Sequence, residues 1–446
     1  MWRAAYLAAG LASRASRQVP ATRATHDDAL PPLKFDDEGV FRISVFSDLH
    51  FGQGESGTGP DQDRNTIRAM EDVLDLDGPQ LVVLNGDLID GESARSRNGT
   101  HYVDQLVGPM VRRNLTWAST YGNHDHSHDA DSDDIWKQEK RWPGARTQRM
   151  VTAQGAGITN YYLVVNPPTC AGDGDGGGGG CVPELVLWFF DSRGGFHFQG
   201  AAQGNWVHAS VVAWANETNA SLARRYKRAI PSLAFVHIPV HATEGAAPEP
   251  HHQPGINDEL PVAQQGEGWC GNDTPDEEGC DYGGQDVPFM RALVGMPGLM
   301  GLFYGHDHGK SWCYRWDSLL PGMDVAGSGL NLCYGQHSGY GGYGDWIRGA
   351  RQIVVTRDKL ADLTVDTYIR LESGAVVGAV SLNSTFNHDY YPATPDQRTY
   401  VDQTVNGKVR VYPSASSRLR PGRELGYCKY AVAACVGLWA VLSRVL

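Results

Sequence analysis

Short apolar runs alternate with amphipathic segments along most of the chain. The first two runs lie within residues 35–50 and 81–87, and between them residues 64–76 place apolar side chains every three or four positions, as one face of a helix does. Four further runs end in polar, glycine-marked turns, at 117–125, 185–194, 233–239 and 298–309, and two more helices are expected at 203–218 and 288–296. Strands that alternate with helices predict an α/β fold with sheets buried on both faces.

We expect one catalytic domain over residues 35–412 of the 446-residue chain. Residues 167–183 and 242–285 have neither helical nor strand periodicity and are expected to be loop insertions. Residues 1–34 are expected to be a signal peptide and an N-terminal extension, and residues 413–446 a linker and a hydrophobic tail.

The overall charge argues against one class of partner. Lys and Arg number 38 against 51 Asp and Glu, which gives a formal net charge of −13. Binding to a nucleic-acid backbone needs a basic stripe, so a nucleic-acid scaffold is not expected as a partner.

The two ends of the chain and its sequons favour the secretory pathway. Arg3 precedes a short apolar stretch of the kind found in signal peptides, and six N-x-S/T sequons predict a glycoprotein. Near the other end, the apolar segment 430–442 is open to three interpretations: a lipid-anchor signal, a tail anchor or a packed helix. We expect a secreted or cell-surface protein with membrane attachment through this tail as one option; the alternative is a cytoplasmic protein. The sequons begin at Asn98, Asn114, Asn216, Asn219, Asn272 and Asn383.

The eight cysteines fall into local pairs. Cys170 and Cys181 bracket a glycine-rich loop, and Cys270 and Cys280 bracket a polar one, so disulfides are expected to close both loops. The alternative is a set of free buried thiols in a cytosolic enzyme. No Cys-x2-Cys occurs, which argues against a zinc finger.

Acids, histidines and one asparagine follow the strand-like runs. Because ligands bind at the carboxyl ends of strands in open α/β sheets, these side chains are expected to converge. In an extended chain, residues two apart point the same way, so Asp48 and His50 are expected to face one ion. Mixed His, Asp and Asn donors suit Fe, Mn or Zn, and there are too many of them for a single ion. The residues are Asp48, His50, Asp87, Asn123, His124, His237, His306 and His308.

With these motifs the chain resembles the calcineurin-like metallophosphoesterases. FSDLHFG, NGDLIDGE, GNHDHSHD, GHDHGKSWC and LCYGQHSGYGGYGDWIRGAR are similar to the purple-acid-phosphatase-like branch that includes the dosage-dependent cell-cycle-regulator phosphatases. The resemblance implies a four-layer αββα sandwich with two divalent or mixed-valence metal ions. It implies these ligand sets: Asp48, His50 and His308 for one ion, Asn123, His237 and His306 for the other, and Asp87 as the bridge.

The resemblance also implies two catalytic residues. His124 would contact the phosphate and protonate the leaving alkoxide, and Asp125 would orient His124. The chain departs from the true purple acid phosphatases at Asp90, which stands where they have a tyrosinate. Mn, Fe(II) or Zn pairs therefore suit this site better than an obligatory ferric ion.

The expected activity is hydrolysis of a phosphoric monoester, in a phosphoprotein or a small phosphate ester, by a water that two metals activate. The alternative within enzymes is a phosphodiesterase or a nucleotide pyrophosphohydrolase. The alternative outside enzymes is a catalytically silent cell-surface glycoprotein. Near the motifs, His126 belongs to a charged loop that either tunes substrate entry or is simply solvated, and a solvated loop is the expectation. Tyr340, Tyr343 and Trp346 either line the pocket or pack on the core.

Overall fold

The computed structural model describes residues 30–413 except 56, 92–98, 127–131, 171–180, 195–196, 199–200, 203–206, 261–263, 267–281 and 403–409. Two six-stranded sheets dominate it. The first has the order β14-β13-β12-β1-β2-β3, with β1 Val40–Phe46, β2 Leu81–Asn85, β3 Trp117–Thr120, β12 Gly349–Thr356, β13 Val365–Leu371 and β14 Val376–Leu382.

The second sheet has the order β10-β11-β9-β8-β5-β4. Its strands are β4 Tyr161–Val165, β5 Leu185–Phe189, β8 Ser232–Phe235, β9 Leu299–Tyr304, β10 Cys313–Trp316 and β11 Leu330–Tyr334. Two small hairpins lie outside both sheets: β6 His197–Phe198 with β7 Ala201–Ala202, and β15 Thr399–Asp402 with β16 Arg410–Pro413.

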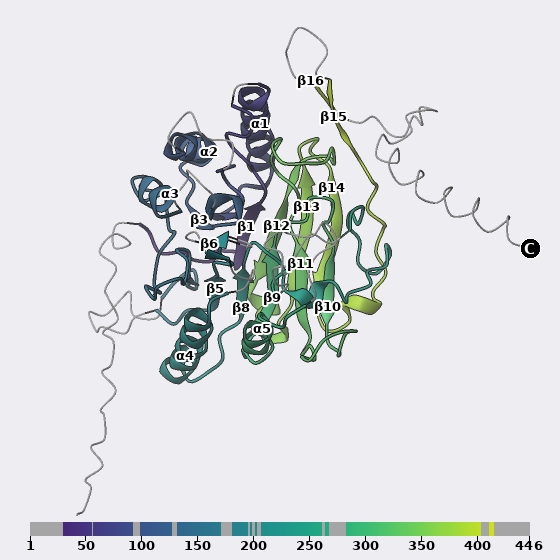
Figure 1. The fold of residues 1–446 in the computed structure, drawn as a ribbon. Coiled ribbons are helices and arrows are strands. Elements are labelled where there is room, and N and C mark those ends of the chain that lie inside the picture. The colour runs from purple at the N-terminus through teal and green to yellow at the C-terminus, as the bar shows by residue number, and fades with distance from the viewer. Residues whose placement is uncertain are drawn as a thin grey trace, which may run out of the picture.

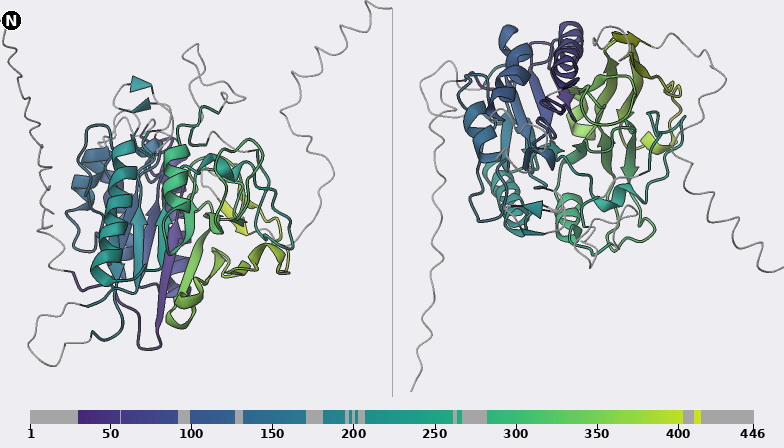
Figure 2. Two further views of the ribbon diagram at one scale, coloured as in Figure 1. Left: turned by 90° about the horizontal axis from the view of Figure 1, so that it is seen from below. Right: turned by 45° about the horizontal axis from the view of Figure 1, so that its top comes forward.

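Three apolar cores separate four structural layers. The central core joins the two sheets, for example through Ile43 of β1 and Leu187 of β5. A second core packs helices against the outer face of the first sheet, through Met70 and Val107, and a third does so for the second sheet, through Val211 and Met290. The helices are α1 Gly59–Asp77, α2 Thr100–Arg112 and α3 Ser132–Glu139 on one side, and α4 Ala209–Tyr226 and α5 Val287–Val294 on the other (Figures 1 and 2). The predicted four-layer αββα sandwich is confirmed.

Parallel pairing brings the strand ends together. β1, β2 and β3 are parallel neighbours in the first sheet, and β5, β8, β9 and β11 are parallel neighbours in the second. The carboxyl ends of each set therefore lie at one edge of their sheet, as expected for an α/β fold.

Most predicted elements are present with shifted bounds. The helix expected at 203–218 begins at Ala209, where His208 accepts a hydrogen bond from the Ser210 N–H as its N-cap, and runs to Tyr226. The pattern did not predict α2, because Gly108 and Pro109 interrupt it and Pro normally breaks a helix interior. It also did not predict the β12–β14 meander.

Two disulfides lie in the described residues. Cys170 and Cys181 are bonded, as predicted, and Cys313 and Cys333 are bonded across the β10–β11 pair, where they stand directly opposite one another. Cys270 and Cys280 lie outside the described residues, as does the hydrophobic tail. Among the helices of the described part, none combines the length and the apolar character needed to cross a bilayer.

Candidate metal centre

Loops that follow five strands bring the expected donors to one place. Asp48 and His50 follow β1, Asp87 follows β2, Asn123 follows β3, His237 follows β8, and His306 and His308 follow β9. The carboxylates of Asp48 and Asp87 and the ring of His237 are almost completely buried. The site therefore draws its donors from both sheets.

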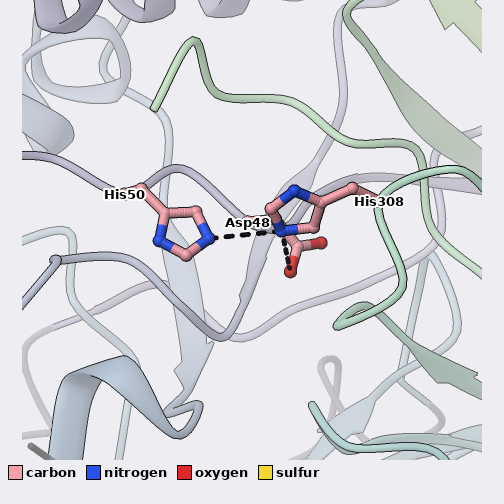
Figure 3. A group of neighbouring side chains, drawn as sticks. All are labelled: Asp48, His50 and His308. Carbon is pink, nitrogen blue, oxygen red and sulfur yellow. Dashed lines mark hydrogen bonds and ion pairs between the residues drawn. The ribbon is translucent and has the colours of Figure 1, made fainter. Parts of the chain in front are cut away.

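A first cluster consists of Asp48, His50 and His308 (Figure 3). The Nε2 atoms of His50 and His308 lie 3.3 Å apart, and His308 Nε2 lies 3.6 Å from Asp48 Oδ1. His308 Nδ1 lies 3.0 Å from the Tyr343 carbonyl oxygen. Donation to that carbonyl leaves the lone pair of His308 on Nε2, which faces the cluster.

A second cluster consists of Asp87, His237 and His306. His237 Nε2 lies 3.1 Å from Asp87 Oδ2, while His237 Nδ1 lies 2.9 Å from the Asn85 carbonyl oxygen. Asp87 Oδ2 is also 3.9 Å from His50 Nε2. Asp87 therefore lies between the two clusters.

The backbone at these donors is unusual. Asp48, His50, Asp87 and His306 all have positive φ, at 58°, 48°, 49° and 75°. The expectation that Asp48 and His50 share an extended segment is wrong, because both residues adopt the left-handed conformation. Non-glycine residues rarely do so, and such positions gather at functional sites.

Glycines give the donors room. A Cβ on Gly122 would lie 2.2 Å from Asp87 Oδ1, and a Cβ on Gly86 would lie 2.3 Å from His237 Nδ1. No neighbour could absorb such a contact, because both contacts are with the donor side chains themselves. The glycines of the NGD and GNH motifs are thus required by the close packing of the site.

The polar atoms of the site fit metal ions. Asn123 Oδ1 is buried and has no hydrogen-bond partner, although buried carbonyl oxygens are normally satisfied. The opposed imidazole nitrogens of the first cluster likewise need a proton or a cation between them. Nitrogen and oxygen donors together are typical of sites for Mn, Fe or Zn.

Burial and charge shift the pKa values of the site in opposite directions. Burial raises the pKa of Asp48 to about 7 and, with the neighbouring His124, lowers the pKa of His50 to about 3. Burial also acts to lower the pKa of His237, but the Asp87 carboxylate outweighs it and raises that pKa to about 9. A proton held between His237 and Asp87 balances the carboxylate charge, and a metal cation can take its place.

His124 lies beside the clusters. Its backbone N–H donates to Asp87 Oδ1 at 2.9 Å, and its ring meets the His50 ring edge-on with centroids 4.8 Å apart. The carboxylate of Asp125 accepts hydrogen bonds from the backbone N–H groups of Leu88, Ile89 and Gly122. These hydrogen bonds tie the loop that carries Asn123 and His124 to the loop that carries Asp87.

Two residues near His124 were named from the sequence, but their contacts in the structure were not predicted. Asp90 is buried, and its carboxylate groups with His50 and His124, all donor atoms lying within 4.8 Å of one another. Its position three residues after Asp87 was the sequence feature that could have indicated its place at the site. His126 was expected in a solvated loop, but its Nε2 lies 2.9 Å from Asp191 Oδ1 and both side chains are buried. No spacing in the sequence predicted that pair, because its partners are 65 residues apart.

Of the three aromatic residues in the glycine-rich segment, two pack on the core and one lies near the donors. Tyr340 and Trp346 are 4% and 6% exposed and pack into the body of the protein, whereas Tyr343 is 46% exposed. The Tyr343 ring stacks on His308, with ring centroids 4.0 Å apart and an interplanar angle of 9°. Only Tyr343 therefore lies at the edge of the donor clusters.

The chain is similar in sequence to several proteins that carry a name, and in structure to solved phosphatases. "Probable inactive purple acid phosphatase 29" of Arabidopsis thaliana is 27% identical over 382 residues, which cover 78% of this chain and 84% of that protein. "Phosphatase DCR2" of Saccharomyces cerevisiae is 26% identical over 69% of this chain, and the match spans only 50% of the yeast protein. A solved dimetal phosphatase from Danio rerio aligns with 77% of this chain and 98% of its own at a TM-score of 0.44 and 12% identity.

The family assignment rests on a longer match. The model of the calcineurin-like phosphoesterase family matches residues 41–310, more than half of the chain, and this span contains both donor clusters and His124. The chain belongs to the calcineurin-like phosphoesterase family.

Proposed function

We propose that this chain is a metal-dependent phosphomonoesterase that acts on a phosphoprotein or on a small phosphate ester. The observation that carries the proposal is the position of Asp87, whose Oδ2 lies 3.1 Å from His237 Nε2 and 3.9 Å from His50 Nε2. One carboxylate between two donor clusters is the arrangement that a two-metal hydrolase needs.

The ligand assignment follows the two clusters. Asp48, His50 and His308 would hold one ion, Asn123, His237 and His306 the other, and Asp87 both. When bound, two such ions supply Lewis-acid charge to the phosphoryl oxygens and make water a stronger nucleophile. Mn, Fe and Zn all suit these donors, singly or as a mixed pair.

His124 would supply the general acid. The hydrogen bond from its backbone to Asp87 fixes it beside the second cluster, and its ring contacts His50 of the first. From there its imidazole can deliver a proton to the leaving oxygen of the substrate. The Asp90 carboxylate lies close to this ring, with its oxygen and the donor nitrogen of His124 within 4.8 Å of one another.

The competing proposal is a catalytically silent protein. It has support in the names of three Arabidopsis relatives, which contain the word "inactive". In this chain, however, both donor clusters are complete and His124 is held beside them. We assign His124 to proton transfer and not to metal binding, and a purely structural metal site would not need such a group, so we favour the enzyme.

Hydrolysis of two matched substrates tests the proposal. Phenyl phosphate and methyl phenyl phosphate release the same phenolate, so a difference in kcat/KM reports on monoester against diester recognition. We expect faster release from the monoester by metal-reconstituted protein, with Asp87→Asn protein as the blank for contaminating phosphatases. Faster hydrolysis of the diester would indicate a phosphodiesterase. Release of diphosphate from ATP, with neither phenyl ester hydrolysed, would indicate a pyrophosphohydrolase. No release from any substrate at full metal loading would indicate a silent protein.

We further infer passage through the secretory pathway. The bonded Cys170–Cys181 and Cys313–Cys333 pairs support it, because disulfides persist in oxidising compartments. Two sequon asparagines, Asn114 and Asn216, are exposed and accessible to a glycan. Attachment to a membrane through the C-terminal tail stays a prediction.

A further inference from the structure

The glycine-rich loop, residues 339–346, is fixed at both ends. The Tyr340 N–H donates to Thr66 Oγ1 at 2.8 Å, and the Tyr340 hydroxyl donates to Glu372 Oε2 at 2.5 Å. At the other end, Trp346 Nε1 donates to Asp258 Oδ2 at 3.1 Å. The loop between these anchors therefore presents Tyr343 in a defined position.

The Tyr343 ring covers the outer side of a candidate ligand. His308 lies between two rings, with His337 at 3.9 Å on one side and Tyr343 at 4.0 Å on the other. His337 is buried, but Tyr343 is 46% exposed. Because His308 stacks on one face of the Tyr343 ring and the Trp346 ring meets it at 81° with centroids 6.3 Å apart, the exposed ring area belongs to the part of the outer face and edge that neither neighbour covers.

The surroundings of Tyr343 favour a planar, uncharged group. Aromatic faces attract other planar rings in stacked or edge-on contact. The Tyr343 hydroxyl lies 3.3 Å from Glu259 Oε1, so a carboxylate stands at the same rim. Burial raises the pKa of Glu259 to about 7, so above that pH its carboxylate would repel a leaving group that carries additional phosphates but would not repel a neutral ring.

We propose that the open face of Tyr343 stacks on the leaving group of the substrate, so that the chain prefers aryl phosphate esters, such as a phosphotyrosyl side chain, to alkyl phosphate esters. The inference rests on the proposed phosphomonoesterase function and assigns its substrate class. Tyr343 is then a specificity-determining residue, which acts on the leaving group and not on the phosphoryl group.

The test compares Tyr343→Ala and Tyr343→Phe with the unchanged chain. For each metal-reconstituted protein, kcat/KM is measured for 2-naphthyl phosphate and for glycerol 2-phosphate, and the ratio of the two values is the readout. An aromatic pair contributes about 0.5–1.5 kcal/mol, so we expect Tyr343→Ala to lower the aryl-to-alkyl ratio about two- to twelvefold. Tyr343→Phe keeps the ring and should keep the ratio.

A binding measurement separates this inference from the proposed activity. The Kd values of phenylphosphonate and methylphosphonate, which are not hydrolysed, are measured by calorimetry on the same metal-loaded proteins, and their ratio should shift as the kinetic ratio does. If Tyr343→Ala weakens aryl and alkyl compounds equally in both assays, Tyr343 only supports His308 and the inference is wrong. If the binding ratio shifts but no protein hydrolyses either ester, the inference holds and the proposed phosphatase activity is wrong.

Discussion

At the scale of single residues, the donor clusters contradict the usual preferences of their side chains. Carboxylates and imidazoles are rarely buried without compensation, yet Asp48, Asp87 and His237 are 1%, 2% and 0% exposed. The loops that follow β1 and β2 also place three donors in the left-handed backbone conformation: Asp48, His50 and Asp87. Such local conflicts are expected where binding, and not folding, determines the residue.

His124→Ala should lower turnover and leave the metal content unchanged. We assign His124 to proton transfer, and loss of a general acid costs about 10²–10⁴-fold in rate. The loss should be larger for an alkyl ester than for 4-nitrophenyl phosphate, because 4-nitrophenolate departs without a proton. His101→Ala, at an exposed position on α2, serves as the control. Loss of an ion, or an equal rate loss for both esters, would show that His124 has another role.

Asp87→Asn should be the most damaging single ligand change. Its Oδ2 atom lies 3.1 Å from His237 Nε2 of the second cluster and 3.9 Å from His50 Nε2 of the first. We expect one ion to be lost, and activity to fall by more than the about 10–100-fold that loss of an outer-shell partner of a metal ligand costs. Metal analysis and phosphate release on the same sample decide the matter. Asp75→Asn, at a surface ion pair with Arg113, is the matched control. Full metal content and near-normal turnover in Asp87→Asn would show that Asp87 does not bridge the two ions.

At the scale of elements, the ends of β2 and β3 require glycine. The Gly122 backbone leaves room for the Asp87 carboxylate, and a Cβ there would also lie 2.6 Å from His237 Cδ2. We therefore expect Gly122→Ala to abolish tight metal binding and to destabilise the fold by about 1–3 kcal/mol, as overpacking does. Metal titration and urea unfolding measure the two effects.

Gly57→Ala provides the comparison for Gly122→Ala. The nearest atom to a Cβ on Gly57 is the Gly54 carbonyl oxygen at 3.7 Å, an ordinary contact. This variant should bind metal normally. If Gly122→Ala behaves in the same way, the close packing of Asp87 against the β3 loop is not needed for the site.

The elements also show how far a single sequence can be interpreted. The strands β1, β2, β3, β5, β8 and β9 were predictable, because buried parallel strands appear as apolar runs and each ends at a motif. The β12–β14 meander was not predicted, and its strand β12 joins the first sheet by pairing with β1 from the other end of the chain, as in Val45 with Arg351. The donors could be named from their motifs, but their left-handed backbone could not, since it depends on loops packed from both sheets.

At the scale of the whole molecule, oxidation and glycosylation should be detectable together. In protein from its native host, we expect a mass shift on deglycosylation, with Asn114 and Asn216 as exposed acceptors. If Cys170–Cys181, Cys313–Cys333 and Cys270–Cys280 are all closed, two of the eight cysteines remain as thiols under denaturation. Asn216→Gln should remove one glycan. Eight titratable thiols and no glycan would instead place the protein in a reducing compartment and leave the metal site unaffected.

A metal titration followed by phosphate release tests the proposed two-metal phosphatase most directly. Chain stripped of metal is supplied with increasing Mn(II), and release of phosphate from phenyl phosphate is plotted against the number of ions bound per chain. Because Asp87 lies between two donor clusters, we expect release to rise until two ions are bound and then to remain constant. Full activity with one ion bound, or no release of phosphate with two ions bound, would contradict the proposed two-metal phosphatase.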